Sequence, residues 1–324
     1  MTDNKKSFLI SGATGLIGKA LIRHLLDRYT DVQIYAIVRN EAAAKKIFGD
    51  DSRIIYLIGD VRNVNLNDCR ASYVIHCAGM TASSAFVNEP VETIDLTVES
   101  ARYLLNYAKM NKVERFIYLS TMEVYGVHMD DAEIYESDPL LMTPASVRAC
   151  YPISKALCEN MCIAYQSEYD VPVNIIRLTQ TFGPGVRYDD RRVFAEFARC
   201  AIEKKDIVLN TAGLTKRSYL HIDDAAEAVI SILENGKPGE IYNAANPETY
   251  CTIREMADMV AGELTNGEIS VKFNESHTEH NEYAPELHMN LSVDKLKDTG
   301  WNPKYGLSDM YKDMINEMKK EKQL

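Results

Sequence analysis

The chain has 324 residues, of which 46% are hydrophobic and 26% charged, enough to bury the core of one large domain or two modest ones. The formal net charge is −11 and the lysines and arginines are scattered, so the composition argues against nucleic acid or an anionic membrane as a partner. The first residues show no signal-peptide pattern and no apolar run approaches membrane-spanning length, so we expect a cytoplasmic protein.

The cysteine and histidine patterns do not predict a metal site. Seven cysteines, an odd number without a Cys-x-x-Cys pair, are typical of reduced thiols in a cytoplasmic protein. His277 and His280 form a His-x-x-His pair, but their segment is polar and offers no further ligand nearby. We therefore expect a surface loop at these histidines and no bound metal.

Strand-like and helix-like segments alternate through the first half of the chain. In chain order they are a strand at 7–11, a helix ending near 29, a strand at 32–38, a helix at 41–48, strands at 53–58 and 72–77, a helix at 91–110, a strand at 115–119, a helix at 151–169 and a strand at 173–178. Such alternation requires right-handed crossovers and a parallel sheet with helices on both faces. The predicted fold class is therefore α/β, with a doubly wound, Rossmann-type parallel sheet.

The regular alternation of strands and helices ends after Leu178. A turn cluster at 183–185 is followed by a predicted helix at 192–203, a short strand near 207, a helix from 223 and a strand at 240–243. We predict that residues 1–178 form the dinucleotide-binding domain. Residues 179–324 then form mainly a smaller C-terminal α/β domain for the substrate, and the strand near 240–244 is free to return to the large sheet.

A glycine-rich segment joins the first predicted strand to the first predicted helix. The segment Gly12-Ala13-Thr14-Gly15-Leu16-Ile17-Gly18 lets the backbone turn tightly and approach a pyrophosphate, while the helix N-terminus supplies free N–H groups. A plain turn also favours glycine, but the position at a strand-to-helix junction favours dinucleotide binding.

The choice between NAD and NADP depends on the end of the second strand. NAD enzymes usually carry an acidic residue there, whereas this chain reads Ile37-Val38-Arg39-Asn40. The cation of Arg39 suits a 2′-phosphate, so NADP is slightly favoured over NAD. The alternative is that Arg39 is only a solvated residue at the start of a helix.

A tyrosine and a lysine stand one helical turn apart in Tyr151-Pro152-Ile153-Ser154-Lys155. A free tyrosine has a pKa of about 10, and a nearby ammonium stabilises the phenolate and makes it a better base. Thr121 lies at the end of the fifth strand, where its hydroxyl could bind the reacting oxygen of a substrate. We predict Thr121, Tyr151 and Lys155 as the catalytic residues.

Together these motifs resemble those of the extended short-chain dehydrogenases, the NAD-dependent epimerase/dehydratase group. The resemblance is carried by Gly12-x-x-Gly15-x-x-Gly18, by Ser120-Thr121-x-Glu123-Val124-Tyr125-Gly126 and by Tyr151-x-x-x-Lys155. Further similar segments lie at 59–61, 74–79, 177–185 and 217–224, so it runs along the whole chain. The stretch Arg148-Ala149-Cys150-Tyr151, followed by Asp190-Arg191-Arg192-Val193, most resembles UDP-glucuronate decarboxylases.

The resemblance implies roles for the matching residues. Thr121 would orient the substrate hydroxyl, Tyr151 would remove its proton, and Lys155 would hold the nicotinamide ribose and tune Tyr151. The implied cofactor-binding residues are Gly12, Thr14, Gly15, Leu16, Ile17, Gly18, Asp60, Val61, Cys77, Ala78 and Gly79, with Arg39, Tyr151 and Lys155. The implied substrate-binding residues are Glu123, Gln180, Arg192 and Arg217, although a solvated loop accounts for Arg192 about as well.

The chain also departs from the pattern of this group. Met122 precedes Glu123 where dehydratases have an acidic residue, which disfavours 4,6-dehydration. Gln180 replaces an asparagine found in many relatives, and the arginine often found just upstream of Leu291 is absent from the segment beginning at Tyr283. We therefore expect that the residues that bind the diphosphate, or the kind of nucleotide that is bound, differ from those of other members of this group.

The resemblance implies an oxidoreductase acting on a sugar nucleotide (UDP-, dTDP-, CDP- or GDP-linked), with hydride transfer between a sugar carbon, usually C4, and NAD(P). An epimerase is the first expectation because it needs no further acid. A UDP-glucuronate decarboxylase-like enzyme and an NADPH-dependent ketoreductase are the alternatives. A non-catalytic dinucleotide sensor is the alternative from another class, although such proteins usually lose the tyrosine or the lysine.

The predicted helices at 91–110 and 151–169 resemble those that form a four-helix dimer interface in this group. We therefore expect a homodimer. Their apolar faces would, alternatively, pack only on the sheet of their own chain.

Overall fold

The computed structural model describes residues 5–274 and 286–322. Its centre is a seven-stranded sheet in the order β11-β7-β5-β4-β1-β2-β3, in which all neighbouring strands are parallel. The strands are β1 (Lys6–Ser11), β2 (Val32–Val38), β3 (Ile54–Ile58), β4 (Tyr73–His76), β5 (Arg115–Thr121), β7 (Val173–Leu178) and β11 (Ile241–Ala244). The predicted α/β, Rossmann-type fold is confirmed.

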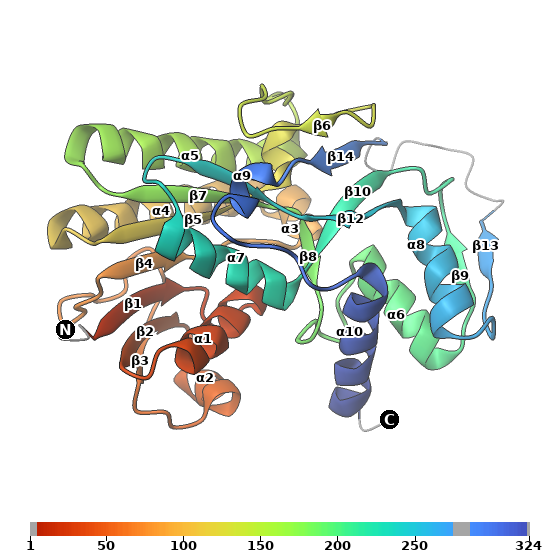
Figure 1. Cartoon of the computed structure of the whole chain (residues 1–324), viewed down its shortest axis with the longest axis horizontal. Helices are drawn as coiled ribbons and strands as arrows, with labels where there is room; N and C mark the ends of the chain where they lie inside the picture. The colour runs from red at the N-terminus through yellow and green to blue at the C-terminus, as the bar shows by residue number, and fades with distance from the viewer. Residues whose placement is uncertain (1–4, 275–285, 323–324) are drawn as a thin grey trace.

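Helices cover both faces of this sheet (Figure 1). On one face α4 (Pro90–Asn111) and α5 (Cys150–Tyr169) pack against each other and against the sheet, around buried residues such as Tyr118 and Phe116. On the other face lie α1 (Leu16–Arg28), α2 (Glu41–Phe48) and α7 (Ile222–Asn235). Buried strands such as β1 are apolar on both sides, because crossover helices cover both faces of a parallel sheet.

A second, five-stranded sheet forms the smaller part of the molecule. Its order is β12-β10-β14-β6, and β8 pairs with β10. The strands are β6 (Glu133–Ile134), β8 (Gln180–Phe182), β10 (Lys216–His221), β12 (Asn246–Thr252) and β14 (His288–Leu291). A pair of strands, β9 (Ile207–Leu209) and β13 (Val271–Phe273), and the helices α6 (Val193–Glu203), α8 (Ile253–Met259), α9 (Asp294–Lys297) and α10 (Leu307–Lys322) complete it.

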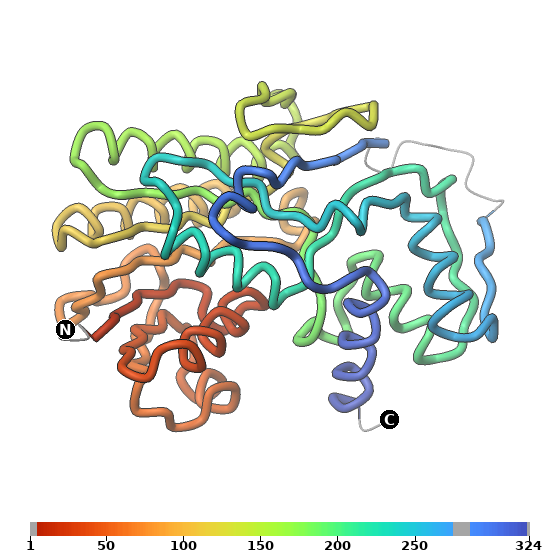
Figure 2. The backbone as a smooth tube through the Cα atoms, viewed as in Figure 1, coloured from red at the N-terminus to blue at the C-terminus, as the bar shows by residue number. Residues whose placement is uncertain are grey.

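The two sheets exchange strands, as the path of the chain in Figure 2 shows. β6 comes from the first half of the chain but lies in the small sheet, next to β14. β11 comes from the second half but pairs with β7 at the edge of the large sheet. The domain boundary at residue 178 stays a prediction, since the chain crosses between the sheets on both sides of it.

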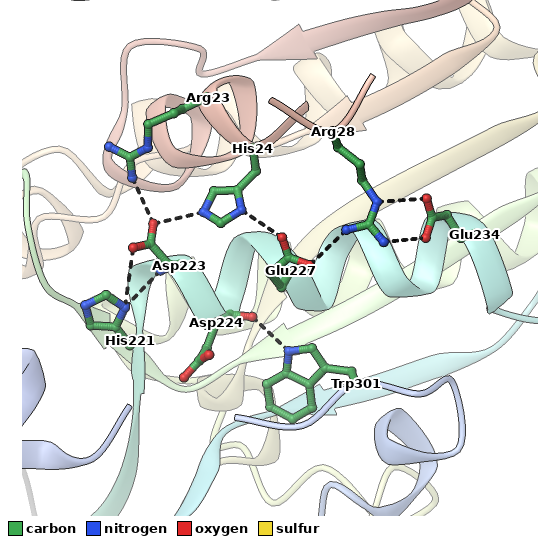
Figure 3. Close-up of polar contacts among 9 residues, drawn as sticks. All are labelled: Arg23, His24, Arg28, His221, Asp223, Asp224, Glu227, Glu234 and Trp301. Atoms are coloured by element: carbon green, nitrogen blue, oxygen red, sulfur yellow. Dashed lines mark hydrogen bonds and ion pairs between the residues drawn. The ribbon is translucent and has the colours of Figure 1, made fainter. Parts of the chain in front are cut away.

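A row of charged contacts joins α1 to α7 (Figure 3). Arg23 binds Asp223 at 2.8 Å, and Arg28 binds Glu234 at 3.0 Å. Between them, Nε2 of His24 lies 3.0 Å from Asp223 and Nδ1 lies 2.8 Å from Glu227. Since α7 follows β10 directly, these contacts connect the helix that begins after the glycine-rich turn to the small sheet.

Among residues 5–274 and 286–322, no helix combines the length and the apolar character needed to span a membrane.

Candidate active site

The glycine-rich turn between β1 and α1 is tightly packed. Gly12 has φ +67°, and a Cβ there would lie 2.8 Å from the backbone nitrogen of Ala78. A Cβ on Gly18 would clash with the carbonyl of Gly12, whose oxygen accepts a hydrogen bond from the amide of Gly15 at 2.9 Å. The turn therefore needs glycine at two positions, and it leaves the start of α1 open for an anionic group.

A buried histidine fixes the end of β4 beside this turn. Nδ1 of His76 lies 2.7 Å from the hydroxyl of Ser11, and Nε2 lies 3.1 Å from the hydroxyl of Ser100. The same Ser11 oxygen accepts a hydrogen bond from the amide of Ala78 at 3.1 Å. Burial lowers the pKa of His76 to about 3, so the ring is neutral and its role is structural. These contacts hold the predicted cofactor segment at 77–79 against the glycine turn.

The structure brings Thr121, Tyr151 and Lys155 together at the carboxyl end of β5. All three side chains are buried, Thr121 as the last residue of β5 and Tyr151 in the first turn of α5. Nζ of Lys155 donates a hydrogen bond to the carbonyl of Leu119 at 2.7 Å. A Cβ on Gly79 would lie 3.7 Å from Nζ of Lys155, so the ammonium reaches the segment that faces the glycine turn.

The surroundings of Tyr151 hold its phenol in the neutral form. Burial raises the pKa of Tyr151 most strongly, and the nearby carboxylate of Glu123 raises it further. A hydrogen bond with Thr121 and the charge of Arg148 oppose this rise. The sequence had predicted that Lys155 would lower the pKa of Tyr151. The Lys155 ammonium instead donates a hydrogen bond to the carbonyl of Leu119. Burial also lowers the pKa of Lys155 itself.

The sequence analysis did not assign two residues that act on Tyr151, one through a ring contact and one through its charge. Phe86, from the short helix α3 (Ser83–Asn88), stacks on the ring of Tyr151. Arg148 binds the carboxylate of Glu123 at 2.9 Å and is 43% exposed in its side chain. The stretch Arg148-Ala149-Cys150-Tyr151 was the only signal for Arg148, and no sequence pattern pointed to Phe86.

Two cations, Arg39 and Arg62, lie near the predicted cofactor-binding residue Asp60. Arg39 is exposed at the end of β2, and its charge helps to lower the pKa of Asp60, so the two side chains are near each other. The larger effect on that pKa comes from Arg62, whose guanidinium binds the Asp60 carboxylate at 2.7 Å. No sequence pattern pointed to Arg62, which binds the carboxylate of the predicted cofactor-binding residue Asp60.

The predicted substrate arginines differ in their partners. Arg192 makes a bidentate ion pair with Asp190, with a closest distance of 2.6 Å, and lies over the ring of Phe194. In Arg217, on β10, the buried Nε has no hydrogen-bond partner among residues 5–274 and 286–322. A guanidinium with a buried, unsatisfied donor suits an anionic ligand, so Arg217 fits the predicted role in substrate binding better than Arg192 does.

Thr179 connects this substrate side to the catalytic residues. Its hydroxyl donates a hydrogen bond to the carbonyl of Ser218 on β10 at 2.5 Å and lies 3.2 Å from the sulfur of Met122. Met122 follows Thr121 directly, in the 3-10 helix Met122–Tyr125. Gln180, the next residue along, pairs with Tyr219 of β10. The strand that carries Arg217 is thus tied to the end of β5.

Among the described residues, no group of three or more His, Cys, Asp or Glu side chains could hold a metal ion. His277 and His280 lie outside the residues that the structure describes.

The chain is similar to known proteins over most of its length. The mouse dTDP-D-glucose 4,6-dehydratase is 28% identical over 317 residues, covering 92% of this chain and 84% of that protein. The Arabidopsis thaliana UDP-glucuronic acid decarboxylase 3 is 28% identical over 310 residues, covering 93% and 85%. The structure of UDP-glucuronic acid 4-epimerase from Bacillus cereus in complex with NAD superposes with a TM-score of 0.81 at 21% identity, covering 97% and 99%.

The profile of the "NAD dependent epimerase/dehydratase family" matches residues 8–245. This segment includes the glycine turn, the end of β5, the Tyr151–Lys155 pair and Arg217. The resemblance predicted from the motifs is confirmed, and the chain belongs to the NAD dependent epimerase/dehydratase family.

Proposed function

We propose that this protein is a sugar-nucleotide-modifying oxidoreductase whose net reaction is epimerisation at C4 of the sugar. The observation that carries this proposal is the convergence of Thr121, Tyr151 and Lys155 beside the segment that packs on the glycine turn. Relatives that act on sugar nucleotides, among them the mouse dehydratase, the Arabidopsis decarboxylase and the Bacillus epimerase, support it.

The glycine turn fits a dinucleotide, because Gly12 and Gly18 allow a tight turn at the start of α1 in which a Cβ would collide with the backbone of Ala78 or of Gly12. When bound, the nicotinamide supplies hydride acceptance and donation at the sugar carbon. Tyr151 removes the proton of the reacting hydroxyl, which Thr121 orients through its own hydroxyl. Lys155 holds the ribose, and its charge favours the phenolate once the phenol is drawn towards substrate.

The diphosphate of the substrate would be bound by Arg217, with Gln180 beside it on the neighbouring strand β8. Arg192 contributes less, because Asp190 already neutralises it. Re-reduction of the C4 ketone from its other face needs no acid besides Tyr151, and Met122 supplies none. This favours epimerisation over 4,6-dehydration.

A second candidate is decarboxylation of a sugar nucleotide that carries a C5 carboxylate. Arg148 favours it, because its guanidinium is 43% exposed and would bind that carboxylate if the substrate displaced Glu123, its present partner. The similarity to Arabidopsis UDP-glucuronic acid decarboxylases also supports it. A reductase that consumes NADPH is the third candidate, and only Arg39 favours it.

For the cofactor, we propose NADP as slightly preferred over NAD. Arg39 is exposed at the end of β2, where a 2′-phosphate would lie, and Arg62 adds a second cation next to Asp60. The family name and the NAD in the Bacillus structure favour NAD instead. Titration of the purified protein with NADH and NADPH decides between them.

We further propose a homodimer formed through α4 and α5. These helices expose Val91 (68%), Ile94 (41%) and Leu157 (47%), apolar surface that a dimer interface would bury. Sedimentation of the variant Val91→Glu/Leu157→Glu tests this: we expect a monomer, and an unchanged mass would contradict it.

The activity test uses protein purified without added cofactor and then incubated with UDP-glucose, UDP-glucuronate or dTDP-glucose, with NAD+ or NADP+ added. We expect a 4-epimer of at least one substrate, without net consumption of added cofactor. A pentose nucleotide with release of CO2 would establish the second candidate. Net reduction of added NADP+ to NADPH, with the sugar left as a ketone, would establish the third, because it is the reverse of ketone reduction.

A further inference from the structure

Three residues on one face of α5 bind the last three residues of β5. Tyr151, Lys155 and Glu159 are spaced four residues apart, so they lie on successive turns of the same helix face. Tyr151 bonds to Thr121, and Lys155 bonds to the carbonyl of Leu119. Glu159 completes the series by accepting a hydrogen bond from the hydroxyl of Ser120 at 2.5 Å.

The Glu159 contact also includes the next strand of the sheet. Ser120 of β5 stands directly opposite Arg177 of β7 in the parallel register. The guanidinium of Arg177 donates hydrogen bonds to the Glu159 carboxylate, from Nη2 to Oε2 at 2.7 Å and from Nε to Oε1 and Oε2 at 3.1 Å and 3.2 Å. The two side chains are only 5% and 6% exposed. Glu159 therefore joins α5 to two neighbouring strands at a single level of the sheet.

The other end of Arg177 is fixed as well. Its Nη1 donates a hydrogen bond to the carbonyl of Glu136 at 3.2 Å, and its guanidinium lies 4.7 Å from the ring centre of Tyr125. The hydroxyl of Tyr125 in turn binds Asn243 of β11 at 2.7 Å. If Glu159 lost these partners, its buried negative charge would have no compensating positive charge or hydrogen bond. Only one position of α5 along β5 keeps these contacts.

We propose that Glu159 is a positioning residue for the Tyr151–Lys155 pair, and that it acts by clamping Ser120 and Arg177 and so fixing α5 against the end of β5. This inference rests on the proposed function in taking Tyr151 and Lys155 as catalytic. Glu159 lies two turns from Tyr151 and needs no contact with substrate or cofactor for this role.

The clamp also has an electrostatic effect on Lys155. Burial lowers the pKa of Lys155, and the Glu159 carboxylate opposes that shift, as do the groups on the elements around the ammonium. Those groups are Cys158 and Cys162 of α5 and Cys77 after β4. The ammonium also lies over the ring of Tyr118 on β5, with Nζ 4.7 Å from the ring centre. Without the Glu159 carboxylate the pKa of Lys155 would be lower, so Lys155 would lose its charge at a lower pH than in wild type.

The test compares Glu159→Gln and Ser120→Ala with wild type and with Glu168→Gln, a control with the same chemical change at an exposed position of α5. For Glu159→Gln we expect kcat to fall about 10- to 100-fold with KM changed less than about 3-fold, because catalytic groups would shift. The alkaline limb of its kcat profile should move to lower pH by about one unit. Ser120→Ala keeps the charge, so it should lower kcat but leave that limb in place.

A second readout does not need turnover. Fluorescence titration with NADH should show weaker binding to Glu159→Gln and unchanged binding to Glu168→Gln, because Lys155 moves in the first variant only. If wild type binds NADH but converts no sugar nucleotide, the proposed function fails while this titration still tests the clamp. The inference would be overturned if Glu159→Gln and Ser120→Ala had the same NADH affinity, kcat and pH profile as wild type. If Glu159→Gln does not fold, Ser120→Ala alone decides it.

Discussion

Phe86 lies flat against Tyr151, with ring centres 4.3 Å apart and planes inclined by only 8°. The two rings come from helices far apart in the sequence, α3 and α5, and both are buried. The stack keeps water from one face of the phenol and is part of the burial that raises the pKa of Tyr151.

Replacement of Phe86 by Leu should therefore change the pH dependence of catalysis. Water admitted beside the phenol lowers its pKa, so the acidic limb of the kcat profile should move to lower pH. The looser fit of Tyr151 should also reduce kcat about 3- to 10-fold. Phe116→Leu, at another fully buried phenylalanine, is the control for lost apolar volume. An acidic limb that moves equally in both variants would contradict this role.

Arg39→Ser tests the source of the NADP preference. Loss of a charge-assisted contact to the 2′-phosphate should weaken NADPH binding by about 10- to 100-fold and leave NADH binding nearly unchanged. Isothermal titration with both cofactors measures this, with the exposed Lys46→Ala on α2 as the control. Equal NADPH affinity in wild type and Arg39→Ser would show that Arg39 is only a solvated residue.

Replacement of Arg217 and replacement of Arg192 should differ in their effects on the KM for the sugar nucleotide. Arg217→Ala should raise KM for the sugar nucleotide about 10- to 100-fold, because the anionic ligand would lose a guanidinium whose buried Nε has no other partner among the described residues. Arg192→Ala should raise it by less than about 3-fold, since Asp190 already neutralises that cation. Initial-rate kinetics test this, and a larger effect from Arg192→Ala would reverse the assignment.

His24 should make stability depend on pH near neutrality. Both ring nitrogens face carboxylates, of Asp223 and Glu227, and the hydrogen bond to Asp223 is the largest cause that raises the pKa of His24 (Figure 3). Arg23 and Arg28 bind the same carboxylates and oppose part of this effect. A group whose pKa is higher in the folded protein stabilises it fully below its unfolded pKa of about 6.5, and this stabilisation disappears as pH rises through the folded pKa.

The thermal midpoint of wild type should therefore fall, between pH 6 and pH 9, about 1–3 °C more than that of His24→Gln. Differential scanning calorimetry at several pH values measures the difference. Parallel curves for the two proteins would show that His24 is not protonated in the folded state.

Local sequence patterns predicted the large sheet, because each of its strands is a buried apolar run followed by a turn or a helix. The small sheet was not predicted. β6 and β8 have only two and three residues, and their partners β14 and β10 lie far along the chain. Such short strands have no visible period, and only tertiary pairing defines them.

The same distinction applies to the site. Thr121, Tyr151 and Lys155 could be found because they stand at fixed positions next to regular elements. Phe86 and Arg62 could not, because their contacts depend on how a short helix and a loop fold back. The partnership of Ser120 with Arg177 follows from the register of β5 and β7, which no local spacing encodes.

The most direct test of the account follows hydrogen from C4 of the substrate. Wild type and Tyr151→Phe would each be loaded with cofactor and mixed with UDP-glucose or UDP-glucuronate deuterated at C4, and the extracted cofactor would be examined by mass spectrometry. We predict deuterium in the reduced cofactor of wild type and a loss of at least about 100-fold in its rate of appearance in Tyr151→Phe. Product formed with no deuterium reaching the cofactor, or equal rates in the two proteins, would contradict the proposed chemistry.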